Sequence, residues 1–290
     1  MPYKKELVVA HSPDADDIFM YYAVKFGWVD CDDFKLSNIA LDIETLNKEA
    51  LKNSYDITAI SFGLYPKIKE EYALLRTAVS FGEGYGPKII KKKGTKLKRS
   101  FKVALSGENT TNALLFKIAY PDAKVVYKNF LEIEKAVLEG VVDAGVLIHE
   151  SILEFDSSLC VEKELWDIWL ELSKDELPLP LGGMAIRRSI PLSSAIKCEE
   201  ILTNAVEVAR KNINLASKML LERDLIRVDE EKLKTYLELY ANDNSVTLND
   251  IQKKALDKLF KIGFDADFFD EAIECEEYFV PTEYKELRGQ

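Results

Sequence analysis

The chain has 290 residues, 47% of them hydrophobic, which is enough to fill the core of one large domain or two ordinary ones. Its 39 Lys and Arg against 50 Asp and Glu give a formal net charge of −11, which argues against nucleic acid or an anionic membrane surface as a partner. The four cysteines lie far apart and form no C-x-x-C pair, so we expect neither a disulfide framework nor a zinc knuckle.

No targeting segment is predicted. Lys4 and Lys5 are followed by only a short apolar stretch, residues 7–10, before polar residues begin, and this is too short for a signal peptide. No segment approaches the roughly 20 apolar residues that a membrane span needs. We therefore expect a protein without a membrane span, located in the reducing cytoplasm, where unpaired cysteines are common.

The first part of the chain alternates between strand and helix patterns. Residues 7–10 predict a strand, and the acidic turn at 12–17 opens a helix that runs to about Phe26. A second unit consists of a strand at 35–41, a helix at 43–51 and a strand at 55–60 that ends at Ser61. Two further strands are predicted around a glycine-rich loop at 81–87, one at 74–79 and one at 88–91.

A basic stretch at 91–99 marks an exposed connector, after which a second β-α-β-α-β pattern begins. It consists of strands at 101–105, 123–127 and 142–148 with helices at 111–120 and 130–139. Residues 160–176 fit either a helix or a short strand. Residues 177–183 contain two prolines and two glycines and cannot form a regular helix, and a strand follows at 184–187.

Beyond Pro191 the pattern predicts three or four helices, with breaks near 229, 241–247 and 263. Two modules joined by chain crossings near 88–96 and 180–187 predict an α/β protein with the two-lobed architecture of type II periplasmic binding proteins. We expect a first, larger lobe from 1–90 and 186–290, including the C-terminal helices, and a second lobe from 91–185. A small-molecule ligand would bind in the cleft between the lobes, which close about a hinge.

One of only two histidines, His149, directly follows the apolar run 141–148. That run predicts a buried strand, and the carboxyl ends of such strands line the ligand crevice of open α/β sheets. Imidazole titrates near neutral pH, so His149 is a candidate general base. On the strand pattern alone, a general base and a histidine that only hydrogen-bonds a neighbour have about equal odds.

Two polar stretches at strand ends are candidate ligand contacts. Residues 106–112 connect a strand to a helix and offer hydroxyl, amide and free N–H groups, which bind carboxylates well at a helix start. A plain N-cap by Asn109 or Thr110 is the alternative, and both roles can hold together. Ser61 ends a strand of the first module at the corresponding level, although a serine there is more often a turn residue.

Three other patterns carry weaker functional interpretations. The loop at 82–87 is followed by a strand, whereas a dinucleotide fingerprint opens a helix, so it is not interpreted as a phosphate loop. His11 with Asp14, Asp16 and Asp17 could suggest a metal site, but acidic capping of a helix explains the aspartates. Arg187 and Arg188 could bind an acidic substrate, although such a pair is more often a solvated strand end.

Four motifs in order resemble the 1,4-dihydroxy-6-naphthoate synthases of the futalosine route to menaquinone. They are HSPDADD at 11–17, SFGEGYGP at 80–87, DAGVLIHE at 143–150 and LPLPLGG at 177–183, within a likeness running from near residue 6 to about 265. The resemblance implies a lyase that converts cyclic dehypoxanthinylfutalosine to 1,4-dihydroxy-6-naphthoate without a metal or organic cofactor.

The resemblance also implies roles for individual residues. The catalytic base of the family corresponds to His149. Its substrate contacts correspond to Thr110 and Thr111, directly after Asn109, and to the stretch that contains Ile60 and ends at Ser61. The alternatives are a small-carboxylate solute-binding protein of the same fold, or the neighbouring chorismate-dehydrating step. The His149-Glu150 pair argues against the dehydration step, and the pair together with the missing export signal argues against the receptor.

Overall fold

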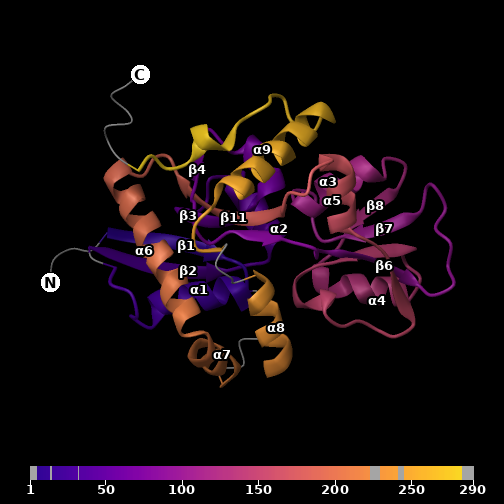
Figure 1. The fold of residues 1–290 in the computed structure, drawn as a ribbon, viewed down its shortest axis with the longest axis horizontal. Helices are drawn as coiled ribbons and strands as arrows, with labels where there is room; N and C mark the ends of the chain where they lie inside the picture. Colours follow the sequence, from indigo (N-terminus) through magenta and orange to yellow (C-terminus); the bar gives the residue numbers. More distant parts are fainter. Residues whose placement is uncertain (1–4, 14, 32, 223–228, 241–244, 283–290) are drawn as a thin grey trace.

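The computed structural model describes residues 5–13, 15–31, 33–222, 229–240 and 245–282. Two β-sheets lie side by side with helices packed around them, and the chain passes from one sheet to the other and back (Figure 1). We call the part built on the first sheet the first half and the part built on the second sheet the second half.

The first sheet has the strand order β2-β1-β3-β11-β4, with β5 also paired to β11. Its strands are β1 (Lys5–His11), β2 (Phe34–Ala40), β3 (Ile57–Ser61), β4 (Tyr72–Leu74), β5 (Ser80–Gly82) and β11 (Leu179–Arg187). Strand β1 runs parallel to β2 and β3, and β11 runs antiparallel to β3 in a register that sets Gly182 opposite Ser61. Helices α1 (Ala15–Lys25) and α2 (Ile43–Ala50) connect the parallel strands.

The second sheet has the order β10-β6-β9-β7-β8. Its strands are β6 (Lys88–Lys92), β7 (Lys102–Leu105), β8 (Lys124–Tyr127), β9 (Ala144–Leu147) and β10 (Leu159–Glu164), and its helices are α3 (Thr111–Ala119), α4 (Ile133–Leu138) and α5 (Leu165–Ser173). Strands β7 and β9 run parallel to each other. Their carboxyl ends therefore meet at one edge, which brings the turn after β7 close to His149.

The two strands at the chain crossings, β6 and β11, each pair with strands of one sheet only. Strand β6 pairs with β9 and β10 in the second sheet, and β11 pairs with β3, β4 and β5 in the first. The lobe limits at residues 90 and 185 stay a prediction, and the strand pairing places residues 179–185 with the first sheet.

The C-terminal part forms the helices α6 (Leu192–Lys211), α7 (Ile213–Glu222), α8 (Glu230–Tyr240) and α9 (Asp250–Asp265). Helix α6 packs along α1, whereas α9 lies on β11 and the 3-10 helix η1 (Phe62–Lys67) and also touches α5. Helix α8 contacts β5 and the 3-10 helix η3 (His149–Ile152). The helices beyond α7 therefore reach both halves. None of the described helices is both long and apolar enough to cross a membrane.

Several predicted elements differ in the structure. The strand predicted at 74–79 is wrong, because β4 ends at Leu74 and β5 begins at Ser80. Between them the Arg76 N–H donates to Glu199 (2.6 Å) and Ala78 adopts a φ of 55°, neither of which continues a ladder. The break predicted near 263 is also wrong. Helix α9 runs through Gly263, where a Cβ would lie 2.1 Å from the Phe269 ring, so glycine serves close packing there.

Other predictions are sharpened. The open stretch 160–176 contains the end of β10 and the whole of α5, and the helix predicted at 130–139 begins as a 3-10 turn (Phe130–Glu132) before α4. Strand β11 starts at Leu179, five residues before the predicted start at 184. Pro180 is tolerated in this strand because it lies at an irregular step in the pairing with β5. Of the break predicted at 241–247, residues 241–244 lie outside the described residues.

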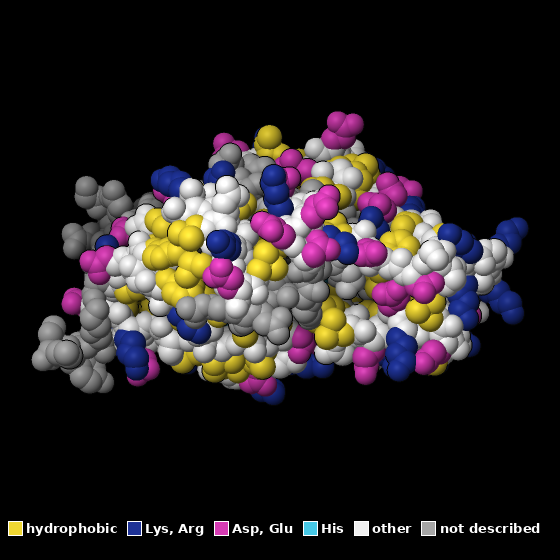
Figure 2. Space-filling view, turned by 90° about the horizontal axis from the view of Figure 1, so that it is seen from below, with side chains coloured by type: hydrophobic (Ala, Val, Ile, Leu, Met, Phe, Trp, Pro, Cys, Tyr) yellow, Lys and Arg dark blue, Asp and Glu magenta, His cyan; other side chains and the backbone are white. Residues whose placement is uncertain are grey.

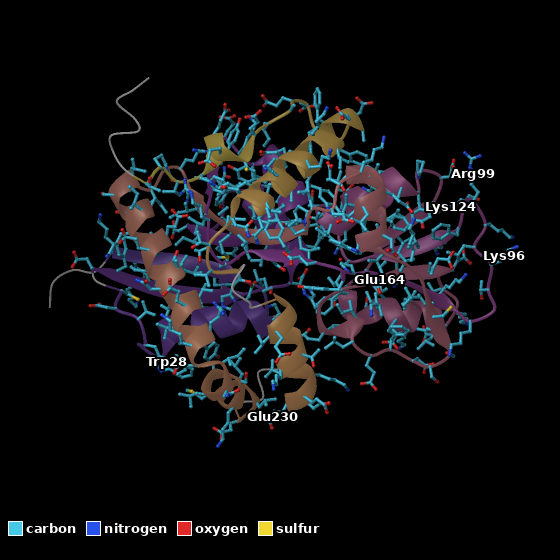
Figure 3. All side chains as sticks on the ribbon, in the orientation of Figure 1. Trp28, Lys96, Arg99, Lys124, Glu164 and Glu230 are labelled. Carbon is cyan, nitrogen blue, oxygen red and sulfur yellow. The ribbon has the colours of Figure 1, made fainter. Side chains whose placement is uncertain are left out.

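The surface is charged and mixed in sign. The basic connector projects from the end of the second half far from the first, with Lys96 and Arg99 pointing outward (Figure 3). On the face shown in Figure 2, acidic and basic side chains are interspersed over both halves.

Candidate active site

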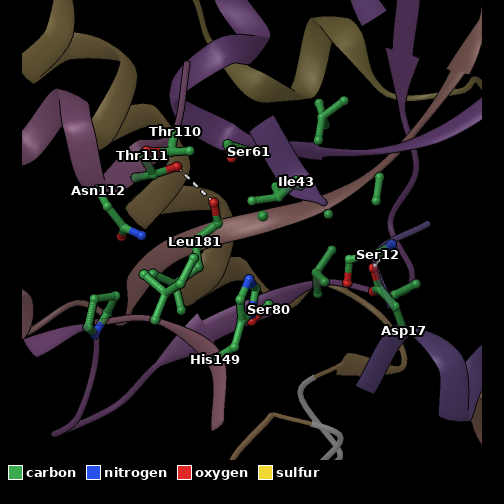
Figure 4. Close-up of a pocket in the computed structure, with 18 residues that line it drawn as sticks. Ser12, Asp17, Ile43, Ser61, Ser80, Thr110, Thr111, Asn112, His149 and Leu181 are labelled. Carbon is green, nitrogen blue, oxygen red and sulfur yellow. Dashed lines mark hydrogen bonds between the residues drawn. The ribbon is translucent and has the colours of Figure 1, made fainter. Parts of the chain in front are cut away.

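A cleft of about 800 Å³ lies between the two halves and is lined by both. The first half contributes the ends of β1 and β3, the starts of α1 and α2, the segment before β5, and β11, and the second half contributes the start of α3 and the end of β9 (Figure 4). The lining residues are Ser12, Asp17, Ile43, Ala59, Ile60, Ser61, Ala78, Val79, Ser80, Pro87, Thr110, Thr111, Asn112, Ile148, His149, Leu181, Gly182 and Gly183.

His149 lies two residues beyond the end of β9 and points into the cleft (Figure 4). It is half-buried, and its ring meets the Phe130 ring edge-on with the centroids 5.1 Å apart. Its backbone φ is 55°, in the left-handed region that residues other than glycine rarely occupy. Such strain persists where the surrounding structure imposes it and clusters at functional sites.

The two threonine hydroxyls at the start of α3 are bound within the protein. Thr110 is the N-cap: its Oγ1 accepts from Ala113 N (3.1 Å) and donates to the Gly107 carbonyl (3.2 Å). Thr111 Oγ1 accepts from Gly63 N (2.9 Å) and donates to the Leu181 carbonyl (2.7 Å). Both hydroxyl protons are thus used within the protein. The unpaired N–H groups of the first helical turn and the helix dipole are what remain for an anion.

Ser61 offers the cleft a hydroxyl proton. The buried Asn47 side chain binds Ser61 twice, with Oδ1 accepting from Ser61 N and Nδ2 donating to Ser61 Oγ, both at 2.9 Å. Because an amide NH₂ group can only donate, Ser61 Oγ is the acceptor in this bond and keeps its own proton for a ligand. Ile60 lines the cleft beside it as apolar wall.

Asn109 does not line the cleft. Its backbone N–H donates to Glu44 Oε2 (3.0 Å) and its side-chain amide donates to Glu44 Oε1 (3.1 Å). Glu44 belongs to α2, so this pair joins the two halves behind the cleft. The approach depends on Gly107, where a Cβ would lie 2.3 Å from Glu44 Oε2.

Four further polar residues line the cleft, namely Ser12, Asp17, Ser80 and Asn112. Asn112 belongs to the predicted contact stretch 106–112 and Asp17 was interpreted as part of a helix cap, whereas Ser12 and Ser80 were not predicted to contact a ligand. Asn112 Oδ1 is buried and has no hydrogen-bond partner among the described residues, which a ligand could supply. Asp17 Oδ2 accepts from Ser12 N (2.8 Å) in the turn before α1, and the Asp17 side chain also lines the cleft. The local pattern indicated a helix start here but not the cleft.

His11 is satisfied within the fold. It is 3% exposed, stacks on Tyr21 and contacts the Ser12 carbonyl through Nδ1 (2.7 Å) and the Asn38 amide nitrogen through Nε2 (3.1 Å). The carbonyl can only accept and the amide NH₂ group can only donate, so both contacts are matched by the tautomer with its proton on Nδ1. Within the described ranges, no group of three or more His, Cys, Asp and Glu side chains is placed to hold a metal ion.

Two other candidate patterns also serve the fold. Arg188 donates to the Lys69 carbonyl (2.7 Å) and packs on the Tyr278 ring. The glycine-rich loop joins β5 to strand β6 rather than opening a helix, so it lacks the geometry of a phosphate loop.

Comparison with known proteins shows what this chain is similar to. It is 26% identical over 254 residues to a 1,4-dihydroxy-6-naphtoate synthase of Thermus thermophilus, covering 88% of this chain and 92% of that one. It is equally similar, 26% over 251 residues, to the synthase of the same name from Streptomyces coelicolor, covering 84% and 88% of the two chains.

Comparison with solved structures identifies the fold. Protein AF1704 from Archaeoglobus fulgidus is 35% identical with a TM-score of 0.82, covering 90% of this chain and 97% of that one. The periplasmic aliphatic sulphonate binding protein SsuA of Escherichia coli is 12% identical, with a TM-score of 0.67 and coverage of 96% and 92%. The predicted α/β fold of two-lobed periplasmic binding proteins is therefore confirmed.

The model of one family matches residues 7–265, which span both sheets and the whole cleft lining. That family is described as menaquinone biosynthesis, in agreement with the resemblance that the four motifs carry. The chain belongs to the menaquinone biosynthesis family.

Proposed function

We propose that the protein is a carbon–carbon lyase that converts cyclic dehypoxanthinylfutalosine to 1,4-dihydroxy-6-naphthoate, with His149 as general base. The family and the names of both curated relatives support the reaction class. One observation supports the choice of His149 as the base: it is held at a left-handed φ in the cleft, which the start of α3 also lines from the second half.

The carboxylate of the substrate binds at the start of α3. The free N–H groups of the first turn and the dipole favour a negative charge, and Ser61 donates its hydroxyl proton from the opposite half. Thr110 and Thr111 shape this subsite: Thr110 caps the helix, and Thr111 fixes its start against Gly63 and Leu181. Binding at both halves draws them together and excludes water from the reacting bond.

His149 then takes the proton of a hydroxyl group on the sugar-derived ring. The electron pair of that O–H bond forms a carbonyl, the adjacent C–C bond breaks in a retro-aldol manner, and its electrons enter the bicycle, which becomes aromatic. General base catalysis of this kind contributes about 10²–10⁴-fold to a rate. The aromatic diol that forms supplies the driving force.

Turnover by the purified protein tests the proposal. We expect 1,4-dihydroxy-6-naphthoate to accumulate from cyclic dehypoxanthinylfutalosine, measured by mass spectrometry, at a rate proportional to enzyme concentration. Tight binding of a small carboxylate without product would place the protein among solute-binding receptors, whose fold it shares. A cytoplasmic location stays a prediction, which fractionation of the source cells would check.

A further inference from the structure

The cleft contains a buried acceptor that the fold does not satisfy. Within the described part of the chain, three buried side-chain oxygens have no hydrogen-bond partner, in Thr77, Ser106 and Asn112. Thr77 and Ser106 do not line the cleft, whereas Asn112 does. A buried acceptor without a donor costs free energy, so the place of Asn112 Oδ1 in a cleft points to a ligand that supplies the donor.

The Asn112 side chain is not needed to hold its own turn in place. Asn112 is the second residue of α3 and lies beside Thr111 on the α3 side of the cleft (Figure 4). The Thr111 hydroxyl bonds both the Gly63 N–H and the Leu181 carbonyl, which fixes the start of α3 against the first half. The Asn112 amide is thus carried on a rigid element and is available to a ligand.

The unpaired oxygen selects a ligand group that carries a proton. A carboxylate only accepts hydrogen bonds, so the carboxylate proposed to bind at the start of α3 cannot satisfy Asn112 Oδ1, whereas a hydroxyl group can. The described lining of the cleft contains no Lys or Arg, so the match of donors and acceptors, rather than pairing with these cations, distinguishes one ligand from another.

We propose that Asn112 is a specificity-determining residue whose Oδ1 accepts a hydrogen bond from a hydroxyl group of the substrate. This inference rests on the proposed function, which supplies the substrate. The hydroxyl has two sources, namely the sugar-derived ring, which the product has lost, and the bicycle, which carries two hydroxyls in the product. In either case Asn112 favours ligands that bear a hydroxyl over ligands that bear only a carboxylate.

A pair of ligands and one variant test the assignment. The product and 2-naphthoate share the bicycle and the carboxylate, but 2-naphthoate has no hydroxyl. Asn112→Leu keeps the number and branching of the side-chain heavy atoms and removes the acceptor. If the bicycle supplies the hydroxyl, we expect the variant to bind the product about five- to tenfold more weakly and 2-naphthoate within twofold of wild type, measured by calorimetry.

The sugar-derived ring would give a different pattern with the same variant. Both Kd values should then stay within twofold of wild type, while kcat/KM for cyclic dehypoxanthinylfutalosine falls about five- to tenfold. In both cases the melting temperature of Asn112→Leu should equal or exceed that of wild type, because the substitution removes a buried acceptor that has no partner in the free protein.

Thr77→Val is the matched control. It also exchanges a buried, unpartnered oxygen for an apolar group, but Thr77 does not line the cleft, so both Kd values and kcat/KM should stay near wild type. Unchanged Kd and kcat/KM in Asn112→Leu overturn the assignment, as does an equal loss of affinity for both ligands or a lower melting temperature. A wild-type protein that binds the product but turns over no substrate overturns the proposed function instead.

Discussion

Asn47 binds Ser61 at two points, accepting from its backbone N–H and donating to its hydroxyl oxygen, both at 2.9 Å. Asn47 is fully buried and also donates to the Asn109 carbonyl at 3.2 Å. The Asn47 amide thus makes the Ser61 hydroxyl a donor towards the cleft, and it also contacts the turn before α3 in the second half.

Replacing Asn47 by aspartate should reverse the direction of the Ser61 hydroxyl. A carboxylate accepts where the amide donated, so Ser61 would turn its proton away from the cleft and a second negative charge would lie near the ligand carboxylate. We expect Asn47→Asp to weaken product binding about tenfold or more, measured by fluorescence titration or calorimetry. Adding Ser61→Ala to this variant should cost nothing further, and additive losses would refute the coupling.

The Thr111 hydroxyl ties α3 of the second half to the first half. It bonds both the Gly63 N–H and the Leu181 carbonyl, so Thr111→Val, of nearly equal volume, leaves a buried donor and a buried acceptor without partners. We expect the free energy of unfolding to fall by about 1–3 kcal/mol in urea titrations. Thr111→Ser retains the hydroxyl and should stay close to wild type, and equal stabilities of the Val and Ser variants would contradict the role of the tie.

Glu44 anchors the turn before α3 from α2. Glu44→Ala removes the acceptor of two Asn109 donors, and we expect a loss of about 2–3 kcal/mol in unfolding free energy together with weaker product binding. Lys48→Ala is the control, because the Lys48 side of its 3.4 Å ion pair with Glu44 is exposed to solvent, and the pair should contribute less than about 1 kcal/mol. If both variants lose the same unfolding free energy, the two bonds from Asn109 to Glu44 do not anchor the turn.

The four thiols should divide into two classes. Cys198 and Cys275 are fully buried, and burial raises the pKa of the Cys198 thiol to about 12 and that of Cys275 further still, so neither ionises at pH 8. Cys31 and Cys160 are partly exposed. An aromatic disulfide reagent should titrate two thiols in the native protein and four in denaturant. Rapid native reaction of all four would contradict the described packing.

Local patterns predicted the parts of the site that local structure decides. An apolar run followed by a histidine predicted His149 at a strand end, and the polar turn at 106–112 predicted the start of α3 in the cleft. Both predictions rest on neighbours in sequence, where period and capping chemistry are visible.

Tertiary contacts decided the rest. Asn109 turned from the cleft because its partner Glu44 lies 65 residues away on α2, and no local pattern contains that pair. Asp17 was interpreted as part of a helix cap, but its side chain binds Ser12 N in the turn before α1, and its place in the cleft depends on α1 packing beside the ends of the strands. Segment 75–79 has strand-like composition, yet contacts with Glu199 and Ser245 hold it out of the sheet.

The proton acceptor role of His149 is tested most directly by His149→Asn. Asparagine tolerates the left-handed φ of 55° better than alanine, so the variant removes the base while it preserves the turn. We expect kcat for conversion of cyclic dehypoxanthinylfutalosine to fall about 10²–10⁴-fold, with the melting temperature and product Kd near wild type. A folded His149→Asn enzyme that retains near wild-type kcat would contradict the assignment of His149 as the base.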